Sequence, residues 1–231
     1  MDPRHDRPNA SSRGQGGFTL VELLVVTAIT GIVMAGIYST FYSQQNAYIT
    51  QTEIAAMQQN LRAAIYNLKR DIRMAGYDPE RTANAGVLSA ASDSIQMSMD
   101  ITDDPDTGNP DGDTTDPGEV VTYAVADPAG TGTNHLVRQS QAGGAMEMAA
   151  EHVDALNFVY LDGTGAITST PAEIRAVQVT VVARTGKPIR GYVNSTAYTN
   201  QQDENIYTAP GDSHRRDVLT AQVKCRNLGL K

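Results

Sequence analysis

Carboxylates are the side chains in this sequence whose type and spacing most clearly allow chemistry. They gather between residues 103 and 119, in a segment that also holds glycine and proline. Calcium prefers about six to eight hard oxygen ligands, which aspartate and glutamate supply. The candidate ligands are Asp106, Asp111, Asp113 and Asp116, with Glu119 shortly after them. We therefore consider a calcium site in this segment, and a solvated loop as the alternative.

The spacing of these carboxylates does not follow the EF-hand pattern. An EF-hand loop has acidic residues at its ends and a glycine at its sharp turn. Aligning Gly112 with that glycine puts Thr107 at the first position and Gly118 at the last, and neither supplies a carboxylate. The calcium interpretation therefore depends only on the density of oxygen donors.

Other residue types offer little for catalysis. The four histidines are scattered and Cys225 is the only cysteine, so neither a zinc-binding pattern nor an intrachain disulfide arises. No nucleophile elbow, phosphate-binding loop or dinucleotide fingerprint is present. The net charge of −8 disfavours general nucleic-acid binding, which needs a basic surface. We predict a protein that is not an enzyme, needs no cofactor unless calcium is one, and recognises no specific nucleic acid.

One carboxylate, Glu22, stands at the start of a strongly apolar segment. From Leu23 to Thr52 the sequence has no Asp, Glu, Lys or Arg, and its most apolar part begins at Phe18. As a helix this part crosses a hydrocarbon core of about 30 Å, so we expect a membrane span at about residues 18–42. A charge at the centre of such a helix costs roughly 2.5–3.5 kcal/mol. The carboxylate therefore needs a functional reason.

Basic residues precede the apolar segment and predict its orientation. Arg4, Arg7 and Arg13 place the N-terminus on the cytoplasmic side by the positive-inside rule, with the rest of the chain outside. The alternative is an ordinary cleaved secretory signal. That signal needs a short apolar core followed by an A-x-A-like site, whereas this segment is long and no such site appears near its end.

The apolar segment opens a long predicted helix. No proline occurs from residue 18 to residue 75, and after Ser43 the sequence becomes polar. Apolar residues then recur at intervals of three and four, which makes one stripe along a helix: Ile54, Met57, Leu61, Ile65, Leu68 and Ile72. Gly76 and Pro79 then provide a stop signal. We predict a helix over 18–75 whose second half packs on a globular domain.

The rest of the chain, residues 76–231, shows a period of two, typical of half-buried antiparallel strands. The clearest alternations are "SIQMSMDI", "VDALNFVYL", "IRAVQVTVVAR" and "DVLTAQVKCRN". The last of these makes Cys225 a small buried residue, and Arg215 and Arg216 flank this strand. Long surface loops are expected at residues 102–118 and 189–214. The predicted fold class is α+β, a long N-terminal helix packed on an antiparallel sheet.

The run "GGFTLVELL", which contains Gly17, Phe18 and Glu22, resembles the class III signal of type IV pilins and type II secretion pseudopilins. The resemblance implies that a prepilin peptidase removes the leader 1–17 by cutting after Gly17. It also implies N-methylation of Phe18 and retention of the apolar helix. In that family the carboxylate at the position of Glu22 docks on the N-terminus of a neighbouring subunit and sets the register of assembly.

Simple physical arguments agree with these roles. Gly17 has no Cβ, so it keeps the end of the leader non-helical and accessible to a protease. Glu22 lies four residues after Phe18, one helical turn away on the same face. A free amine at Phe18, from the same or another subunit, would offset the cost of the buried carboxylate. A carboxylate that only reaches out to water is the alternative.

Three further stretches resemble PilW-type minor pilins: "LKRDIRMAGYDP", "VDALNFVYLDGTG" and "RRDVLTAQVKCRNL". The resemblance implies a minor pilin that primes pilus assembly in the bacterial inner membrane and ends at the filament tip. Its implied partners are the prepilin peptidase, other minor pilins, the major pilin, the inner-membrane assembly platform and membrane lipid. It also implies that the domain after the span is periplasmic. A J-like minor pseudopilin of type II secretion and a tip adhesin are the alternatives.

Overall fold

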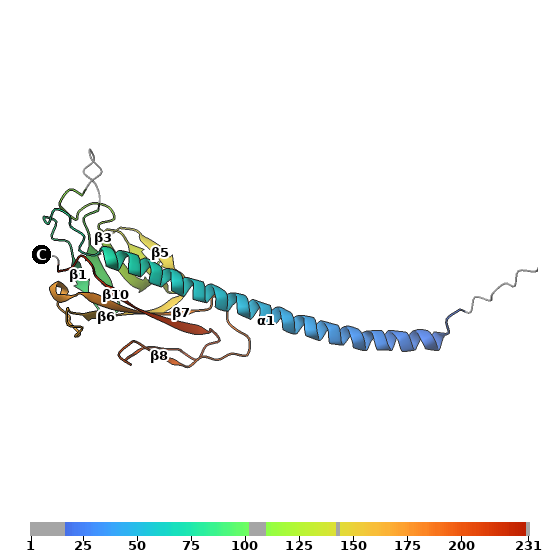
Figure 1. Cartoon of the computed structure of the whole chain (residues 1–231). Coiled ribbons are helices and arrows are strands. Elements are labelled where there is room, and N and C mark those ends of the chain that lie inside the picture. The colour runs from blue at the N-terminus through green and yellow to red at the C-terminus, as the bar shows by residue number, and fades with distance from the viewer. Residues whose placement is uncertain (1–16, 102–109, 142–143, 230–231) are drawn as a thin grey trace, which may run out of the picture. The chain divides into compact units, whose positions relative to one another are not determined.

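The computed structural model describes residues 17–101, 110–141 and 144–229. The chain divides into two compact units, Met1–Ile49 and Thr50–Lys231, which we call the N-terminal unit and the globular unit. Helix α1 (Leu20–Met74) begins in the first and ends in the second (Figure 1). The helix expected over residues 18–75 is therefore present. The predicted leader lies outside the described residues, except for Gly17.

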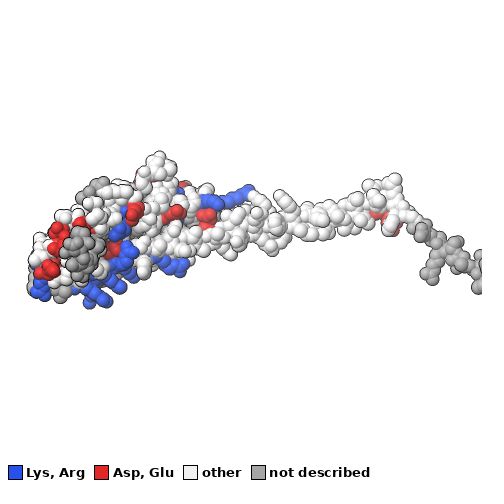
Figure 2. Space-filling model, turned by 90° about the horizontal axis from the view of Figure 1, so that it is seen from above, with Lys and Arg blue, Asp and Glu red and all other residues white. Residues whose placement is uncertain are grey.

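The N-terminal unit presents an apolar helical surface. Every large apolar side chain between Phe18 and Ile49 is exposed, by 44% at the least and 88% at the most. Figure 2 shows the corresponding stretch of α1 as largely uncharged surface. Within the described residues, α1 is the one helix that is long and apolar enough to cross a membrane. Among the described residues of this unit the surface has no partner, so it fits lipid or the helices of other subunits.

The second half of α1 belongs to the globular unit and buries one stripe. Of the predicted stripe, Met57, Leu61, Ile65, Leu68 and Ile72 are buried, and Ile54 is packed at its edge. The predicted amphipathic half is thus confirmed. The helix ends at Met74, and Gly76 follows with a φ of +75°, the left-handed conformation that a glycine adopts without strain.

In the described residues, two larger antiparallel sheets and one two-stranded hairpin follow the helix. The first has the order β1-β2-β3-β4-β5, a meander in which each strand pairs with the next. Its strands are β1 (Val87–Ala90), β2 (Ile95–Ser98), β3 (Val120–Ala126), β4 (His135–Gln139) and β5 (Met146–Ala150). The second has the order β10-β7-β6, with β6 (Val153–Leu161), β7 (Ala176–Arg184) and β10 (Arg216–Lys224). A 3₁₀ turn, η1 (Pro171–Glu173), lies between β6 and β7. The predicted α+β class is confirmed.

A buried carboxylate attaches α1 to the first sheet. Asp71, 5% exposed, accepts hydrogen bonds from Arg138 Nε on β4 at 2.8 Å and from Tyr123 Oη on β3 at 2.9 Å. Arg70 Nε, next to it on α1, adds a third at 2.7 Å. Burial alone would raise the pKa of Asp71, but these three hydrogen bonds outweigh it and lower the pKa below its ordinary value. The helix and the sheet are therefore joined by a paired charge inside the core.

The segment 189–214 differs from the irregular loop that the sequence suggested. It contains a short hairpin, β8 (Ala197–Thr199) paired with β9 (Asn205–Thr208). Side-chain hydrogen bonds hold this segment in place. Its two strands therefore do not need a buried apolar face, and they lack the apolar alternation that identifies a half-buried strand in a sequence. The other expected loop, 102–118, is irregular from residue 111 onward, and its residues 102–109 lie outside the described residues. Cys225 is buried as predicted, with 5% exposure.

Candidate assembly site

Glu22 has a partner in its own helical turn. Its Oε2 atom accepts hydrogen bonds from the backbone N–H and from the hydroxyl of Thr19, both at 3.4 Å. In return, the Thr19 hydroxyl oxygen accepts the backbone N–H of Glu22 at 3.2 Å. Thr19 directly precedes Leu20, the first residue of α1. Thr19 and Glu22 thus occupy the N-cap and N3 positions and form a reciprocal capping box.

This capping box gives Glu22 a local role that the sequence analysis missed. The signal was present in the letters "TLVE", since Ser or Thr followed three residues later by Glu, just before an apolar run, identifies a helix start. The negative charge also lies at the positive end of the helix dipole. The bonds at 3.4 Å are long, so the carboxylate keeps acceptor capacity for a cationic group.

Gly17 and Phe18 lie just before the capping box, outside the helix. A Cβ added at Gly17 would meet no atom within 4 Å, and the side chain of Phe18 is 88% exposed. The peptide bond between them is therefore open to an enzyme, as cleavage requires. The nitrogen of Phe18 belongs to this peptide bond, so the amine expected to pair with Glu22 arises only after the cut. Cleavage, methylation and the register role remain predictions.

Three threonine hydroxyls in the apolar part of α1 are satisfied within the helix. The Thr27 hydroxyl donates to the carbonyl oxygens of Leu23 and Leu24 at 3.0 and 2.9 Å. The hydroxyls of Thr30 and Thr40 donate to the carbonyl oxygens four residues earlier, at 2.7 and 3.0 Å. Bonds of this kind let threonine enter a nonpolar environment without leaving a donor unpaired. These three hydroxyl groups therefore do not oppose burial of the helix in lipid.

The predicted calcium ligands are described only in part. Asp106 lies outside the described residues, and among the described ones no group of three or more His, Cys, Asp or Glu is placed to hold a metal. Asp113 uses its Oδ1 to accept the backbone N–H and hydroxyl of Thr115 at 2.7 and 2.8 Å, bonds that lower its pKa. The Oδ1 atom of Asp111 likewise accepts the backbone N–H of Asp113, at 3.1 Å. The ligand set proposed from the sequence remains untested.

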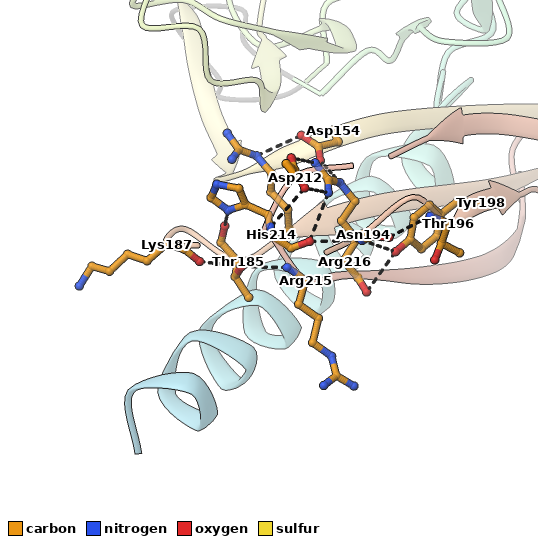
Figure 3. Close-up of polar contacts among 11 residues, drawn as sticks. Asp154, Thr185, Lys187, Asn194, Thr196, Tyr198, Asp212, His214, Arg215 and Arg216 are labelled. Atoms are coloured by element: carbon orange, nitrogen blue, oxygen red, sulfur yellow. Dashed lines mark hydrogen bonds and ion pairs between the residues drawn. The ribbon is translucent and has the colours of Figure 1, made fainter. Parts of the chain in front are cut away.

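A second polar cluster holds the segment with the hairpin against the second sheet (Figure 3). Arg216 begins β10 and is almost fully buried, with 2% of its side chain exposed. Its Nε donates to Asp154 on β6 at 2.6 Å, and its two terminal nitrogens donate to the two oxygens of Asp212 at 2.6 and 2.7 Å. The hydrogen bonds from Arg216 lower the pKa of Asp212 to about 2. Arg216 is therefore a structural side chain and is not available to an external ligand.

The same cluster extends into the hairpin. Asn194 is buried, and its Nδ2 donates to Tyr198 Oη at 3.0 Å and to the carbonyl oxygen of His214 at 3.2 Å. The guanidinium of Arg216 also lies 5.4 Å from the ring centre of Tyr207 on β9. Tyrosines and amides thus replace the apolar core that a longer hairpin would have.

Comparisons with known proteins bear on the N-terminal motif and the fold. Residues 12–38 match the family model of the prokaryotic N-terminal methylation motif. No curated protein matches the sequence. Among solved structures, the chain is similar to a type IV-like pilin from Thermus thermophilus, with 19% identity and a TM-score of 0.48, over 74% of this chain and 98% of that one. The N-terminal methylation motif is therefore present at residues 12–38, whereas membership of the type IV pilins and the PilW-type likeness remain predictions.

Proposed function

We propose that this chain is a minor pilin, a non-catalytic subunit that primes type IV pilus assembly in the inner membrane and is incorporated at the filament tip. The observation that carries the proposal is the placement of Glu22. Its carboxylate lies in the first turn of an exposed apolar helix, within the methylation motif. Glu22 follows Phe18, the residue expected to begin the mature chain, by four positions. Such a carboxylate is useful when a cation reaches it inside a bundle of apolar helices.

The apolar half of α1 supports the proposal because its exposed side chains need a covering partner. Its large side chains are exposed on all sides, so it must be covered first by lipid and then by the helices of other subunits. Between helices in lipid the apolar contacts are not selective, because lipid tails are equally apolar. A charge pair near one end therefore gives the register that apolar packing cannot give. In this role the partners are the prepilin peptidase, other pilins and the inner-membrane assembly platform.

The experiment separates the charge of Glu22 from its capping role. Glu22→Gln keeps a side chain that can accept the Thr19 N–H but removes the charge. Thr19→Ala removes the cap and keeps the charge. Each variant replaces the native gene as the only copy, and the cleaved, methylated N-terminus is measured by mass spectrometry. We expect both variants to be processed, Glu22→Gln to lose most surface pili, and Thr19→Ala to keep most of them.

Two results would contradict the proposal. Normal piliation with Glu22→Gln as the only copy shows that the charge has no role in assembly. Equal losses for both variants assign Glu22 to helix capping alone. A deletion strain then identifies the system, because a pilus subunit affects twitching motility and piliation, whereas a secretion pseudopilin affects the release of exported proteins.

A further inference from the structure

His152 lies in the tight turn between β5 and β6, and its ring borders a small hollow beside α1. Its φ is +53°, in the left-handed region, and its ring centre lies 5.8 Å from that of His135 on β4. The Nδ1 atom of His152 is buried and has no hydrogen-bond partner in the part of the chain that the structure describes. A buried ring nitrogen of this kind is costly and calls for a reason.

The loop after β7 connects this ring with α1. A Cβ on Gly186 would stand 2.9 Å from His152 Nε2 and 3.5 Å from Glu53 Oε2, so the glycine lets the loop lie close to both groups. The same Glu53 oxygen accepts the backbone N–H of Lys187 at 3.1 Å, and Glu53 Oε1 lies 3.7 Å from Lys187 Nζ. Glu53 follows Thr50, the first residue of the globular unit, by three positions. Glu53 therefore fastens the first turn of α1 in this unit to the loop.

A second histidine holds the backbone of the turn. The Nδ1 atom of His135 accepts the backbone N–H of His152 at 3.3 Å, and His135 is only 8% exposed. A protonated imidazole has donors on both nitrogens and no acceptor. This bond therefore exists only while the His135 ring is neutral.

The groups around the His152 ring disfavour a positive charge on it. The charged and titratable groups that face the ring come from every element packed on it: Glu53 on α1, His135 on β4, Glu151 beside it in the turn, Arg184 on β7 with its partner Asp154 on β6, and Lys187 after β7. Burial lowers the pKa of His152 below its ordinary value of 6.5, and the charge of Arg184 lowers it further, with only partial opposition from the two glutamates. The ring is therefore neutral at neutral pH. The hollow beside it, of about 280 Å³, lets solvent reach the site.

We propose that His152 is the trigger of a pH-sensitive latch, in which Glu53 and the Lys187 N–H hold α1 to the loop after β7 in neutral solution and separate in mild acid. A proton on His152 adds a positive charge beside Arg184 and leaves both ring nitrogens as donors. The Glu53 carboxylate faces the same point of Gly186 as the ring does, so it becomes the counter-charge of the ring. The Lys187 N–H then loses its acceptor.

The direction of the pH effect follows from linkage. The pKa of His152 is lower in the folded chain than its ordinary value of 6.5, so the closed arrangement prefers the neutral ring. The stabilisation by the neutral ring is complete above about pH 6.5 and declines as the pH falls through the lowered pKa. Met57, one turn after Glu53, is 2% exposed and anchors the next part of α1 in the core, so the opening is confined to the turn at Glu53. The latch lies within the globular unit, and it stands or falls separately from the assembly role of Glu22.

The test is hydrogen exchange of the full-length protein in detergent, measured by mass spectrometry at about pH 7.5 and about pH 5 and corrected for the intrinsic exchange rate at each pH. Peptides that contain Lys187 report the latch, because its N–H donates to Glu53. We expect the protection of this N–H to fall at least about tenfold in acid, the effect of one pKa unit between the closed and open states. His152→Asn removes the titrating ring, and asparagine tolerates the left-handed backbone, so this variant should keep its protection in acid.

The matched control is the other histidine that contacts this loop. The Nδ1 atom of His214 lies 2.7 Å from the carbonyl oxygen of Thr185, one residue before Gly186. His214→Asn should keep the ratio between the two pH values that the wild type shows, whatever it does to the protection itself.

Three results would overturn the proposal. The protection of Lys187 does not fall in acid, or it falls as much in His152→Asn as in the wild type. In the third, the buried central strand β7 loses protection in parallel, which means that the whole unit opens.

If His152→Asn does not fold, Glu53→Gln decides instead. Its amide oxygen still accepts the Lys187 N–H, but a charge that favours the protonated ring is lost, which lowers the pKa of His152. The acid response should therefore move to lower pH. A response at the same pH as in the wild type would contradict the latch.

Discussion

Removing Arg138 is expected to destabilise the globular unit far more than removing Arg70, although both arginines bond to the carboxylate of Asp71. Asp71 has 7% of its side chain exposed, Arg138 20% and Arg70 53%. Removing one partner of a fully buried ion pair costs about 3–5 kcal/mol, because the other charge is left uncompensated. Arg138 is partly hydrated, so we expect about 2–3 kcal/mol for Arg138→Ala. For Arg70→Ala we expect at most about 1 kcal/mol, as for other exposed pairs.

The assay is urea unfolding of the full-length chain in detergent, followed by the near-ultraviolet signal of its ten tyrosines, since the chain has no tryptophan. Both substitutions should lower the midpoint with little change in the slope, which reports the surface exposed on unfolding. The reasoning is wrong if Arg70→Ala costs as much as Arg138→Ala. It is also wrong if neither substitution lowers the midpoint.

The pH dependence gives a second check on the same pair. The pKa of Asp71 is lower in the folded state than its ordinary value of 3.8. The unfolded chain therefore binds a proton more readily, and the stabilisation is complete above about pH 4 and declines as the pH falls through the lowered pKa. Arg138→Ala removes much of that lowering. The difference in stability between wild type and variant should thus shrink in acid, and a constant difference would contradict the assignment.

Two further predictions concern the second sheet. Arg216→Lys keeps the positive charge, but a lysine cannot form the two bonds to Asp212 and the bond to Asp154 at the same time. We therefore expect faster proteolysis within residues 186–215. Arg215→Lys, at an exposed neighbouring position, is the control and should leave the proteolysis rate unchanged. Burial raises the pKa of the Cys225 thiol to about 12, so at pH 8 it should resist iodoacetamide in the folded protein and react within minutes in urea; equal rates in both states would contradict its burial.

The sequence predicted those elements whose apolar residues repeat with a period. The stripe from Met57 to Ile72 and the alternation along β7 are each visible locally, because a buried face repeats every three to four residues on a helix and every two on a strand. The hairpin β8–β9 has no such signal. Its strands are held by Asn194 and by tyrosines that contact a buried arginine.

The buried charges could not be predicted for a different reason. Asp71 lies in the charged run "LKRDIR", which reads as the solvent face of a helix, and its partner Arg138 is 67 residues further along the chain. Asp100 has the same character, since its burial follows from the pairing of β2 with β3. Pairs that tertiary structure creates leave no local pattern, whereas Thr19 and Glu22 are three residues apart and were readable from the start.

The capping box bears on when Glu22 finds its first partner in the proposed assembly mechanism. Before cleavage, Glu22 is already held at the start of α1, where Thr19 and the helix dipole both favour a negative charge. The carboxylate therefore does not wait unpaired in the apolar segment for a neighbouring subunit to arrive. In the proposed assembly, the predicted cleavage after Gly17 would then place a charged amine on Phe18, the residue adjacent to Thr19. Because the amine and Thr19 would bond to the same carboxylate oxygens, weakening the cap should weaken assembly little, so Thr19→Ala should keep most of its surface pili.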